Sequence, residues 1–234
     1  RIDFLISGYD TAAKANIAVV ELKQWDGAST EVVENKDGIV KTALGGGIRE
    51  TTHPSYQAVS YAQLLRDFNA SIREEPIDLH PMAYLHNFES RYREIIENDI
   101  YQPYIDAAPI YIRGDTRELR SSLESRIDMG DDRESLHTLN DGKIRPAKSL
   151  QNSLVEMLDD RDEFTLIDSQ KVVYERAIEL ANRSRRDGQK RVLLVDGGPG
   201  TGKTVVAINI LSELIQQNML AQYVSKNRAP REVY

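Results

Sequence analysis

The sequence predicts an α/β protein: a mixed sheet with flanking helices, then a mostly helical bridge, then the start of a second α/β domain. Two observations predict this class. Short runs rich in β-branched and aromatic residues alternate with segments whose apolar residues recur at helical spacing. Late in the chain, the apolar run RVLLV, a glycine-rich segment and a further helical pattern follow one another as a strand–loop–helix unit. We place the domains at residues 1–113, 114–160 and 161–234.

The composition is that of a soluble globular protein. The 234 residues are 40% hydrophobic and 29% charged, which suffices for a sizeable core, and no apolar run approaches the length of a membrane span. The absence of cysteine excludes disulfides and thiolate zinc sites and favours a cytoplasmic location. The net charge of −7 argues against a general nucleic-acid-binding coat but leaves room for a local basic groove.

The elements of the first domain follow from hydrophobic periodicity and turn residues. Side-chain alternation predicts the strands, and the sequence His53-Pro54-Ser55 is typical of a helix start. In order, we expect strands over 1–6 and 17–24, a hairpin extension of the same sheet over 30–40 around Asp37-Gly38, a flexible break at 45–47, a helix from 53–55 onward, a strand over 82–87, a helical stretch over 89–101 and a strand over 108–112.

The bridge and the last domain are predicted in the same way. We expect a solvated helical segment over 115–130, a polar, turn-rich segment over 131–148, a helix over 149–158, an acidic stretch over 159–163, a helix over 169–183 and a strand over 191–195.

Residues 197–204, GGPGTGKT, complete the phosphate-binding pattern G-x-x-x-x-G-K-[ST]. Glycines let successive main-chain N–H groups face a phosphate chain, and the helix that follows adds its positive end. We expect Lys203 to neutralise the β- and γ-phosphates of ATP and Thr204 to ligate Mg²⁺. The strand and helix on either side argue against an accidental match. The nucleotide-binding residues are Gly197, Gly198, Pro199, Gly200, Thr201, Gly202, Lys203 and Thr204.

Gln170 is a second candidate for nucleotide contact. It lies 33 residues before Lys203, at a predicted helix start. A glutamine amide both donates and accepts hydrogen bonds, so it can recognise an adenine edge. The alternative is an ordinary surface glutamine.

A separate constellation in the first domain comprises Asp3, Glu21 and Lys23. Alternation places Glu21 and Lys23 on one face of their strand, while Val20 and Leu22 point into the core. If the first two strands pair, Asp3 comes beside Glu21, and two carboxylates suit Mg²⁺ or Mn²⁺. This is the D…(D/E)-x-K pattern of PD-(D/E)xK nucleases, in which Lys23 positions the water or stabilises charge. The alternative is a solvated strand edge.

Two further features favour the nuclease interpretation. The predicted order of strands and helix matches the nuclease core. The segment QAVSY is similar to the Q-x-x-x-Y element of the RecB-like branch, and its spacing places Gln57 and Tyr61 on one helix face beside the site. The alternative for Tyr61 is core packing.

The remaining polar and aromatic residues carry less weight. The histidines show no metal-binding spacing, and His53 and His80 each precede a proline, which favours turns. The basic residues within 183–191 fit either a solvated loop or a nucleic-acid contact. Trp25, the only tryptophan, fits packing better than base stacking.

The chain resembles bacterial nuclease–helicase proteins in which a PD-(D/E)xK-type region precedes a Schlafen-like superfamily 1 helicase domain. The resemblance implies ATP-driven work on DNA or RNA, with Asp3, Glu21, Lys23, Gln57 and Tyr61 in the nuclease region. It also implies a RecA-like fold for the phosphate-loop domain. The resembling segments are RIDFLI, VVELKQW, HPSYQAVSYAQLLRDFN, HPMAYLHN, IRPAKSL, FTLIDSQKVVYE, GGPGTGKT and YVSKNRAPREVY, the last similar to the next helicase motif.

The sequence departs from that family after the phosphate loop, since it lacks a Walker-B-type acidic motif, an arginine finger and the second helicase core. We therefore expect a fragment of a larger protein that hydrolyses ATP poorly. Two alternatives stay open: a non-catalytic nucleic-acid-binding module with a degenerate nuclease fold, and a regulatory P-loop NTPase with protein partners. The sequence does not choose between DNA and RNA and gives no oligomeric state.

Overall fold

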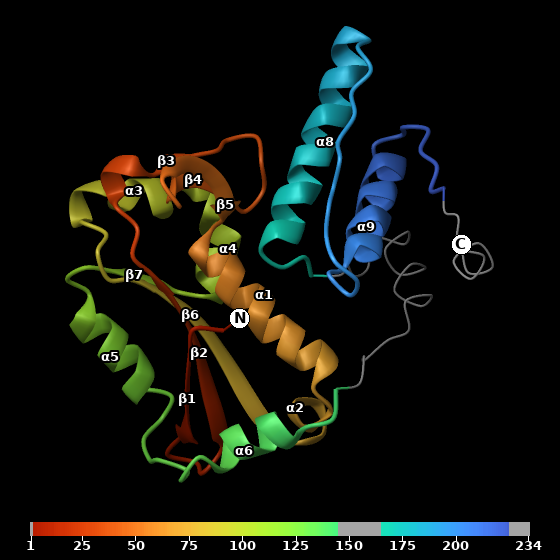
Figure 1. Cartoon of the computed structure of the whole chain (residues 1–234). Helices are drawn as coiled ribbons and strands as arrows, with labels where there is room; N and C mark the ends of the chain where they lie inside the picture. The colour runs from red at the N-terminus through yellow and green to blue at the C-terminus, as the bar shows by residue number, and fades with distance from the viewer. Residues whose placement is uncertain (1, 145–164, 225–234) are drawn as a thin grey trace. The chain divides into compact units, whose positions relative to one another are not determined.

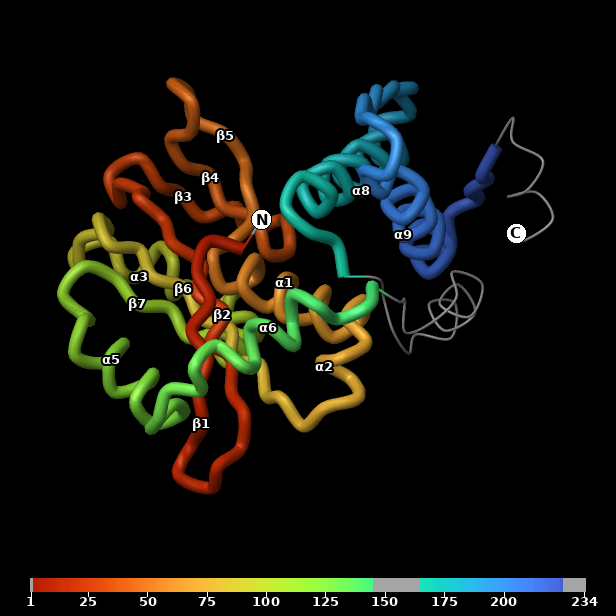
Figure 2. Tube along the Cα trace, turned by 60° about the horizontal axis from the view of Figure 1, so that its bottom comes forward, coloured from red at the N-terminus to blue at the C-terminus, as the bar shows by residue number. Residues whose placement is uncertain are grey.

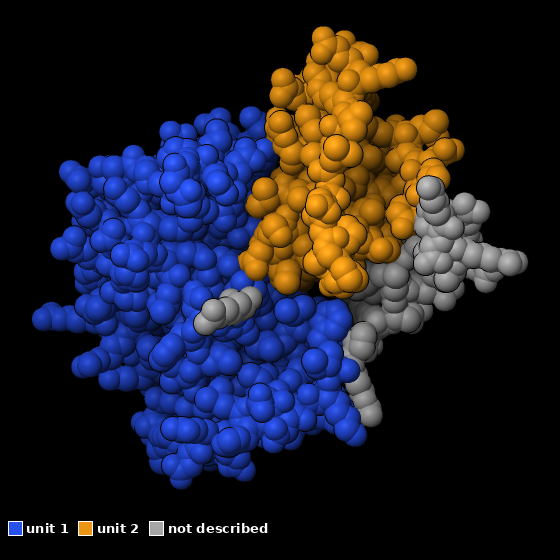
Figure 3. Space-filling view, viewed as in Figure 1, with its two compact units in different colours: residues 1–147 blue, residues 148–234 orange. Residues whose placement is uncertain are grey.

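The structure, a computed structural model, describes residues 2–144 and 165–224. The chain divides into two compact units, residues 1–147 and 148–234, which Figure 3 colours separately. The division falls inside the range 114–160 that the sequence assigns to a bridge.

The larger sheet of the first unit is mixed, as predicted. Its strand order is β1-β2-β6-β7. β1 (Phe4–Tyr9) is antiparallel to β2 (Ala15–Lys23), and β2, β6 (Ile77–Leu85) and β7 (Ile110–Ile112) are mutually parallel. β2 is buried along most of its length, which explains its nearly continuous apolar sequence.

Helices cover both faces of this sheet (Figures 1 and 2). On one face, α1 (Pro54–Phe68), α2 (Ala70–Glu74) and α6 (Glu134–Asp141) pack against Ile17 and Val19. On the other face, the segment of α5 (Thr116–Glu124) packs against the alternate residues of β2, with Leu119 and Leu123 in the cluster around Ala18, Val20 and Met82. Because successive side chains of β2 point to opposite faces, the strand contributes to a hydrophobic core on each side of the sheet.

The second sheet of this unit corrects the prediction that the hairpin over 30–40 extends the first sheet. β3 (Glu31–Val32), β4 (Ile39–Leu44) and β5 (Gly47–Thr52) form a separate antiparallel sheet, which follows the short 3-10 helix η1 (Gly27–Ser29). The expected flexible break is a two-residue hairpin turn, since Gly45 and Gly46 have φ of +56° and +85° and Leu44 pairs with Gly47. A turn with two positive φ angles favours glycine at both positions.

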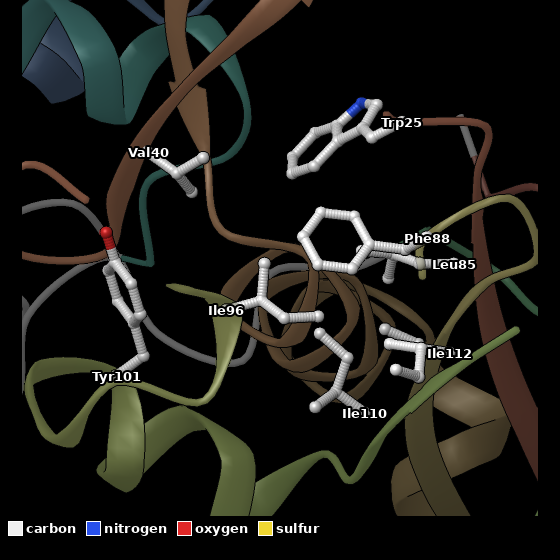
Figure 4. Packing of buried hydrophobic residues seen from close by; sticks show 9 residues of the cluster. Trp25, Val40, Leu85, Phe88, Ile96, Tyr101, Ile110 and Ile112 are labelled. Carbon is white, nitrogen blue, oxygen red and sulfur yellow. The ribbon is translucent and has the colours of Figure 1, made fainter. Parts of the chain in front are cut away.

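A buried cluster lies against the ends of β6 and β7 (Figure 4). Trp25 lies next to Phe88 in this view, with Ile96, Ile110 and Ile112 in the same cluster. Trp25 is therefore a core residue. The predicted helix over 89–101 is broken into short turns, because the Asn98 side chain caps a new turn and Pro103 lies in the first turn of the next helix. The pieces are η2 (Ser90–Tyr92), α3 (Arg93–Ile96), η3 (Asp99–Tyr101) and α4 (Gln102–Ala107).

Two histidine predictions meet different outcomes. His53 lies at the N-cap of α1, where its Nδ1 accepts a hydrogen bond from Ser55 N at 3.2 Å. His80 lies inside β6, so the turn predicted for it is wrong. A strand tolerates the following Pro81 because, in the part of the chain that the structure describes, no strand pairs with the outer edge of β6 there.

Residues 114–144 contain one helix that periodicity identified and one that it missed. α5 falls within the predicted helical range, whereas α6 occupies a stretch expected to be polar and turn-rich. α6 buries Ser135, and Leu139 packs against the first core. The predicted helix over 149–158 and the acidic stretch over 159–163 lie outside the described residues.

The second unit contains α8 (Ser169–Asp187) and α9 (Lys203–Gln216), which contact each other. Tyr174 Oη donates to Glu213 Oε2 at 3.2 Å between them. The strand predicted over 191–195 is not formed, because no other segment of 165–224 offers it a hydrogen-bonded ladder. Val192 and Leu194 are consequently 84% and 90% exposed. Within the part of the chain that the structure describes, no helix is long and apolar enough to cross a membrane.

Candidate functional site

The paired ends of β1 and β2 bring Asp3, Glu21 and Lys23 together. The antiparallel register pairs Phe4 with Val20, so the preceding Asp3 comes opposite Glu21. Asp3 Oδ2 accepts a hydrogen bond from Leu22 N at 3.1 Å. The carboxylate thus binds a main-chain donor of β2 just beyond the last ladder pair of β1.

Glu21 is the most unusual group in this set, since its residue is only 2% exposed. Its Oε1 accepts a hydrogen bond from Lys23 Nζ, while Oε2 has no hydrogen-bond partner among the described residues. Burial raises the pKa of Glu21 to about 7; Lys23 opposes this change, and the carboxylate of Asp3 adds to it. A buried, half-satisfied carboxylate is costly in a fold and is typical of functional sites.

The orientation of β2 partly corrects the sequence interpretation. Glu21 and Lys23 alternate with Val20, and they share the face of Ile17 and Val19 that α1 covers. Val20 is buried as predicted. Leu22 does not point into the core but is 39% exposed. It lies beyond the α5-side cluster that covers Ala18 and Val20.

Gln57 and Tyr61 lie on the face of α1 that covers β2. Gln57 Nε2 donates to Tyr61 Oη at 3.0 Å, and both residues are buried. Tyr61 also packs in the cluster with Ile17 and Val19, so core packing accounts for its ring. α1 leads through α2 into β6, whose first residue Ile77 pairs with the first residue of β2. The N-terminal end of α1, with Gln57, therefore lies toward the Glu21 end of β2.

Asp3 and Glu21 are compatible with a hydrated Mg²⁺ or Mn²⁺. Glu21 Oε2 is an unused buried acceptor, and Asp3 offers a second, exposed carboxylate. Within the described residues, no group of three or more His, Cys, Asp or Glu side chains could hold a metal. Mg²⁺ commonly retains several waters and uses only one or two carboxylates. The donor set fits that pattern and does not fit an all-protein cage.

The phosphate loop in the second unit combines glycines of positive φ with an uncapped helix start. Gly200 and Gly202 have φ of +76° and +81°, a region that glycine adopts without strain. α9 begins at Lys203, and no side chain caps its first N–H groups. Uncapped N–H groups at the start of a helix bind phosphates readily.

Lys203 and Thr204 are both exposed at the start of α9. Lys203 Nζ donates to Gly197 O at 2.5 Å and to Gly198 O at 2.6 Å. Thr201 Oγ1 donates to Gly198 O at 2.9 Å. The loop therefore folds around the ammonium group, and phosphate oxygens would replace main-chain carbonyls as its partners.

Gln170 lies against the phosphate loop. Its Nε2 donates to Thr201 O at 3.1 Å, and its Oε1 accepts from Ile167 N at 3.1 Å. A Cβ atom added at Gly202 would lie 2.4 Å from Gln170 Nε2. The glutamine thus joins the start of α8 to the loop, and one N–H and one lone pair of its amide remain for an adenine edge.

Sequence reasoning missed two contributors. Asp196 Oδ1 accepts from Gly197 N at 2.8 Å and so fixes the start of the loop. Lys23 Nζ lies 5.8 Å from the ring centroid of the buried Trp25, which helps to hold the ammonium near Glu21. Only the position of Asp196, directly before the loop, could have signalled its role. Of the segment 223–234, only the first two residues lie within the described part of the chain.

Comparison with known proteins gives one match. Residues 190–234 match the model of the Schlafen group 3 DNA/RNA helicase domain. The match includes the phosphate loop and α9, and it covers less than a fifth of the chain. This segment is thus similar to Schlafen-type helicases, which indicates a nucleic-acid-related, nucleotide-binding function. No curated protein and no solved structure matches the chain.

Proposed function

We propose that the chain is part of an ATP-dependent nuclease–helicase that cleaves DNA or RNA in its first unit and binds ATP in its second. One observation carries the nuclease part of the proposal. A buried carboxylate, Glu21, has an unused acceptor oxygen and lies between the Lys23 ammonium and the Asp3 carboxylate. A surface-exposed strand edge, the main alternative from sequence, would not bury such a group.

The chemistry assigned to the first unit is hydrolysis of a phosphodiester bond. Mg²⁺ or Mn²⁺ held by Asp3 and Glu21 would polarise the phosphate and lower the pKa of a bound water. The Lys23 ammonium orients the attacking water or stabilises the charge that develops on the phosphate oxygens. Gln57 and Tyr61, hydrogen-bonded to each other, form the buried wall of α1 on the same face.

The chemistry assigned to the second unit is recognition of the triphosphate of ATP. The N–H groups at the start of α9 and the Lys203 ammonium would bind the phosphates, and the Thr204 hydroxyl would ligate Mg²⁺. Gln170, already in contact with the loop, would recognise adenine. The match of residues 190–234 to a helicase domain supports this assignment.

The test of the nuclease proposal is cleavage of single-stranded DNA and RNA by the purified chain in the presence of Mg²⁺ or Mn²⁺. We expect Glu21→Gln to reduce cleavage by about 100-fold or more, because the carboxylate is required for metal binding. Glu34→Gln is the matched control, since Glu34 is an exposed glutamate of the same unit. Equal cleavage by wild type and Glu21→Gln would refute the proposal.

A second candidate is a nucleic-acid-binding module with a degenerate nuclease fold. It is favoured by the lack of a third carboxylate or histidine near Asp3 and Glu21 among the described residues. In that case the wild type binds single strands with a steep salt dependence but cleaves none of them, with or without metal. A regulatory NTPase with protein partners predicts instead no salt-dependent binding of nucleic acid.

A further inference from the structure

A small pocket of about 210 Å³ lies at the open edge of β6, within the first unit. β6 is nine residues long, but β7 pairs only with residues 83–85, so the outer edge over 77–82 has no neighbouring strand among the described residues. The polar and charged residues that line the pocket are Arg66, His80, Asp106, Ser122 and Arg126.

The structure of this edge disfavours the addition of another strand. Ala83 N donates to Pro109 O at 3.0 Å, so residues 79 and 81 present their main-chain groups to the same open side. Pro81 lacks an N–H group, and Leu79 O already accepts from Arg66 Nη2 at 3.2 Å. A proline and a long cationic side chain are typical protections of an open strand. A small ligand suits the pocket better than a peptide.

The hydrogen bonds of His80 fix its protonation. Arg126 Nη1 lies 2.8 Å from His80 Nδ1, and because a guanidinium can only donate, Nδ1 is the acceptor. His80 Nε2 therefore carries the hydrogen and donates to Asn16 Oδ1 at 2.7 Å. The imidazole is neutral. It occupies one donor of Arg126 without neutralising its charge.

The pocket consequently has an excess of positive charge. Arg66 binds a main-chain carbonyl and Arg126 binds a neutral imidazole, and neither forms an ion pair with a carboxylate among the described residues. Asp106 is exposed at the rim, where its Oδ1 accepts from Gln102 Nε2 at 2.6 Å.

The titration behaviour of His80 agrees with this count of charges. Its pKa is lowered by burial and then by the positive charges of Arg126, Arg66 and Lys14, against the opposing carboxylate of Asp78. Asp78 itself is paired with Lys14 at 2.6 Å and so adds little net negative charge.

We propose that this pocket binds a phosphate group through the guanidinium groups of Arg66 and Arg126, with the Ser122 hydroxyl as a further donor. Two guanidiniums with unused N–H donors match the oxygens of a tetrahedral oxyanion, and arginine binds such groups in a bidentate manner. A pocket of about 210 Å³ is large enough for a phosphate group.

The proposal does not depend on nuclease activity at Glu21. A free phosphate and a phosphate of a nucleic-acid strand share this chemistry, and different ligands distinguish them. The phosphate loop of the second unit would also bind inorganic phosphate, so the measurements use the full chain carrying Lys203→Ala. The ring signals of His80, identified by comparison with His80→Asn, report the pocket locally in an NMR titration.

We expect inorganic phosphate to shift the His80 signals, and Arg126→Gln to weaken this binding about tenfold or more, as for the loss of a charge-assisted hydrogen bond. Arg126→Lys should bind phosphate more weakly than the parent chain but more tightly than Arg126→Gln. Lysine retains the positive charge and loses the bidentate geometry of the guanidinium group. Arg120→Gln, an exposed arginine of α5, should bind like the parent chain. Trp25 fluorescence verifies that each variant is folded.

Two oligonucleotides identify the source of the phosphate. Tighter binding of a 5′-phosphorylated strand than of its 5′-hydroxyl form, with the difference lost in Arg126→Gln, supports a terminal phosphate. Equal competition of both strands with inorganic phosphate supports a backbone phosphate. The proposal is overturned if neither phosphate nor oligonucleotide shifts the His80 signals, or if a folded Arg126→Gln binds phosphate as tightly as the parent.

Discussion

Replacement of Glu21 by glutamine should stabilise the first unit at neutral and alkaline pH. The unfolded carboxyl titrates near 4.5, whereas burial raises the pKa of folded Glu21 to about 7. The folded state therefore binds more protons than the unfolded state between these values, and the free energy of unfolding falls as pH rises through them. At about 1.4 kcal/mol per tenfold change in the ionisation constant, the loss is about 3 kcal/mol.

Glutamine has nearly the same shape and does not titrate. The difference in unfolding free energy between Glu21→Gln and wild type should therefore be small near pH 5 and rise to about 3 kcal/mol in favour of the variant by about pH 8. Lys23 loses its partner in the variant, but its side chain is 16% exposed and retains access to water. That residual hydration limits the cost of the lost ion pair.

The chain carries its own probe for this experiment. Trp25 is the only tryptophan and is buried in a cluster of the first unit, so its fluorescence follows the unfolding of that unit alone. Urea unfolding of wild type, Glu21→Gln and the exposed control Glu34→Gln across this pH range gives the difference curves. A variant that is less stable than wild type at high pH, or a difference independent of pH, would contradict the raised pKa of Glu21.

The variants must be compared with wild type because a second group, His53, also changes the free energy of unfolding over this pH range. Its effect runs in the opposite direction to that of Glu21. Burial lowers the pKa of His53 to about 4, and the neutral ring stacks on Tyr101 at 4.3 Å between centroids. The unfolded histidine binds a proton below about 6.5, so this group destabilises the fold as pH falls. The two effects oppose each other in the wild type, and only the variants separate them.

Three further predictions test other parts of the chain. Lys203→Ala should weaken the binding of a fluorescent ATP analogue by about tenfold or more, since a charge-assisted contact to the phosphates is lost; unchanged affinity would exclude the loop as the nucleotide site. Gly202→Ala should loosen the loop, because the added Cβ would lie 2.4 Å from Gln170 Nε2. The residue also has a φ of +81°, a conformation that costs about 1–2 kcal/mol in residues other than glycine. Hydrogen exchange over 197–204 measures the loosening, and a second change, Gln170→Ala, should relieve the clash but not the backbone strain. His53→Gln should remove the fall in unfolding free energy that occurs as the pH drops below about 6.5. If urea unfolding of the variant shows the same fall at acid pH, other groups cause it.

Sequence patterns predicted the elements whose periodicity is strong. β2, α1, α8 and α9 lie where alternation, helical spacing and the Pro54 start signal placed them. Glycine gave a less certain signal. The run at 45–47 is equally consistent with a break and with a hairpin turn, and only the pairing of Leu44 with Gly47 distinguishes them. Whether a hairpin extends one sheet or forms another depends on long-range contacts that local sequence does not contain.

The candidate nuclease residues illustrate what alternation can and cannot supply. It predicted correctly that Glu21 and Lys23 share a face, because strand periodicity fixes this. It failed for Leu22, since a leucine is expected inside but the covering helix does not extend over it. The depth of Glu21, and with it the raised pKa, follows from the packing of α1 over the strand. Spacing along the chain contains no such information.

The two ends of the phosphate loop differ in the contacts of the segments that flank them. At its C-terminal end, Gln170 binds Thr201 O and α9 packs on α8, so the glycines enter the helix from a fixed point. At its N-terminal end, the apolar run before Asp196 has no ladder within the described residues and exposes Leu194 by 90%. A run that is apolar on both faces is typical of a parallel strand covered on two sides. The ammonium of Lys203 donates to the carbonyls of Gly197 and Gly198. If the loop binds a triphosphate as proposed, we expect phosphate oxygens to replace these carbonyls as partners of the ammonium.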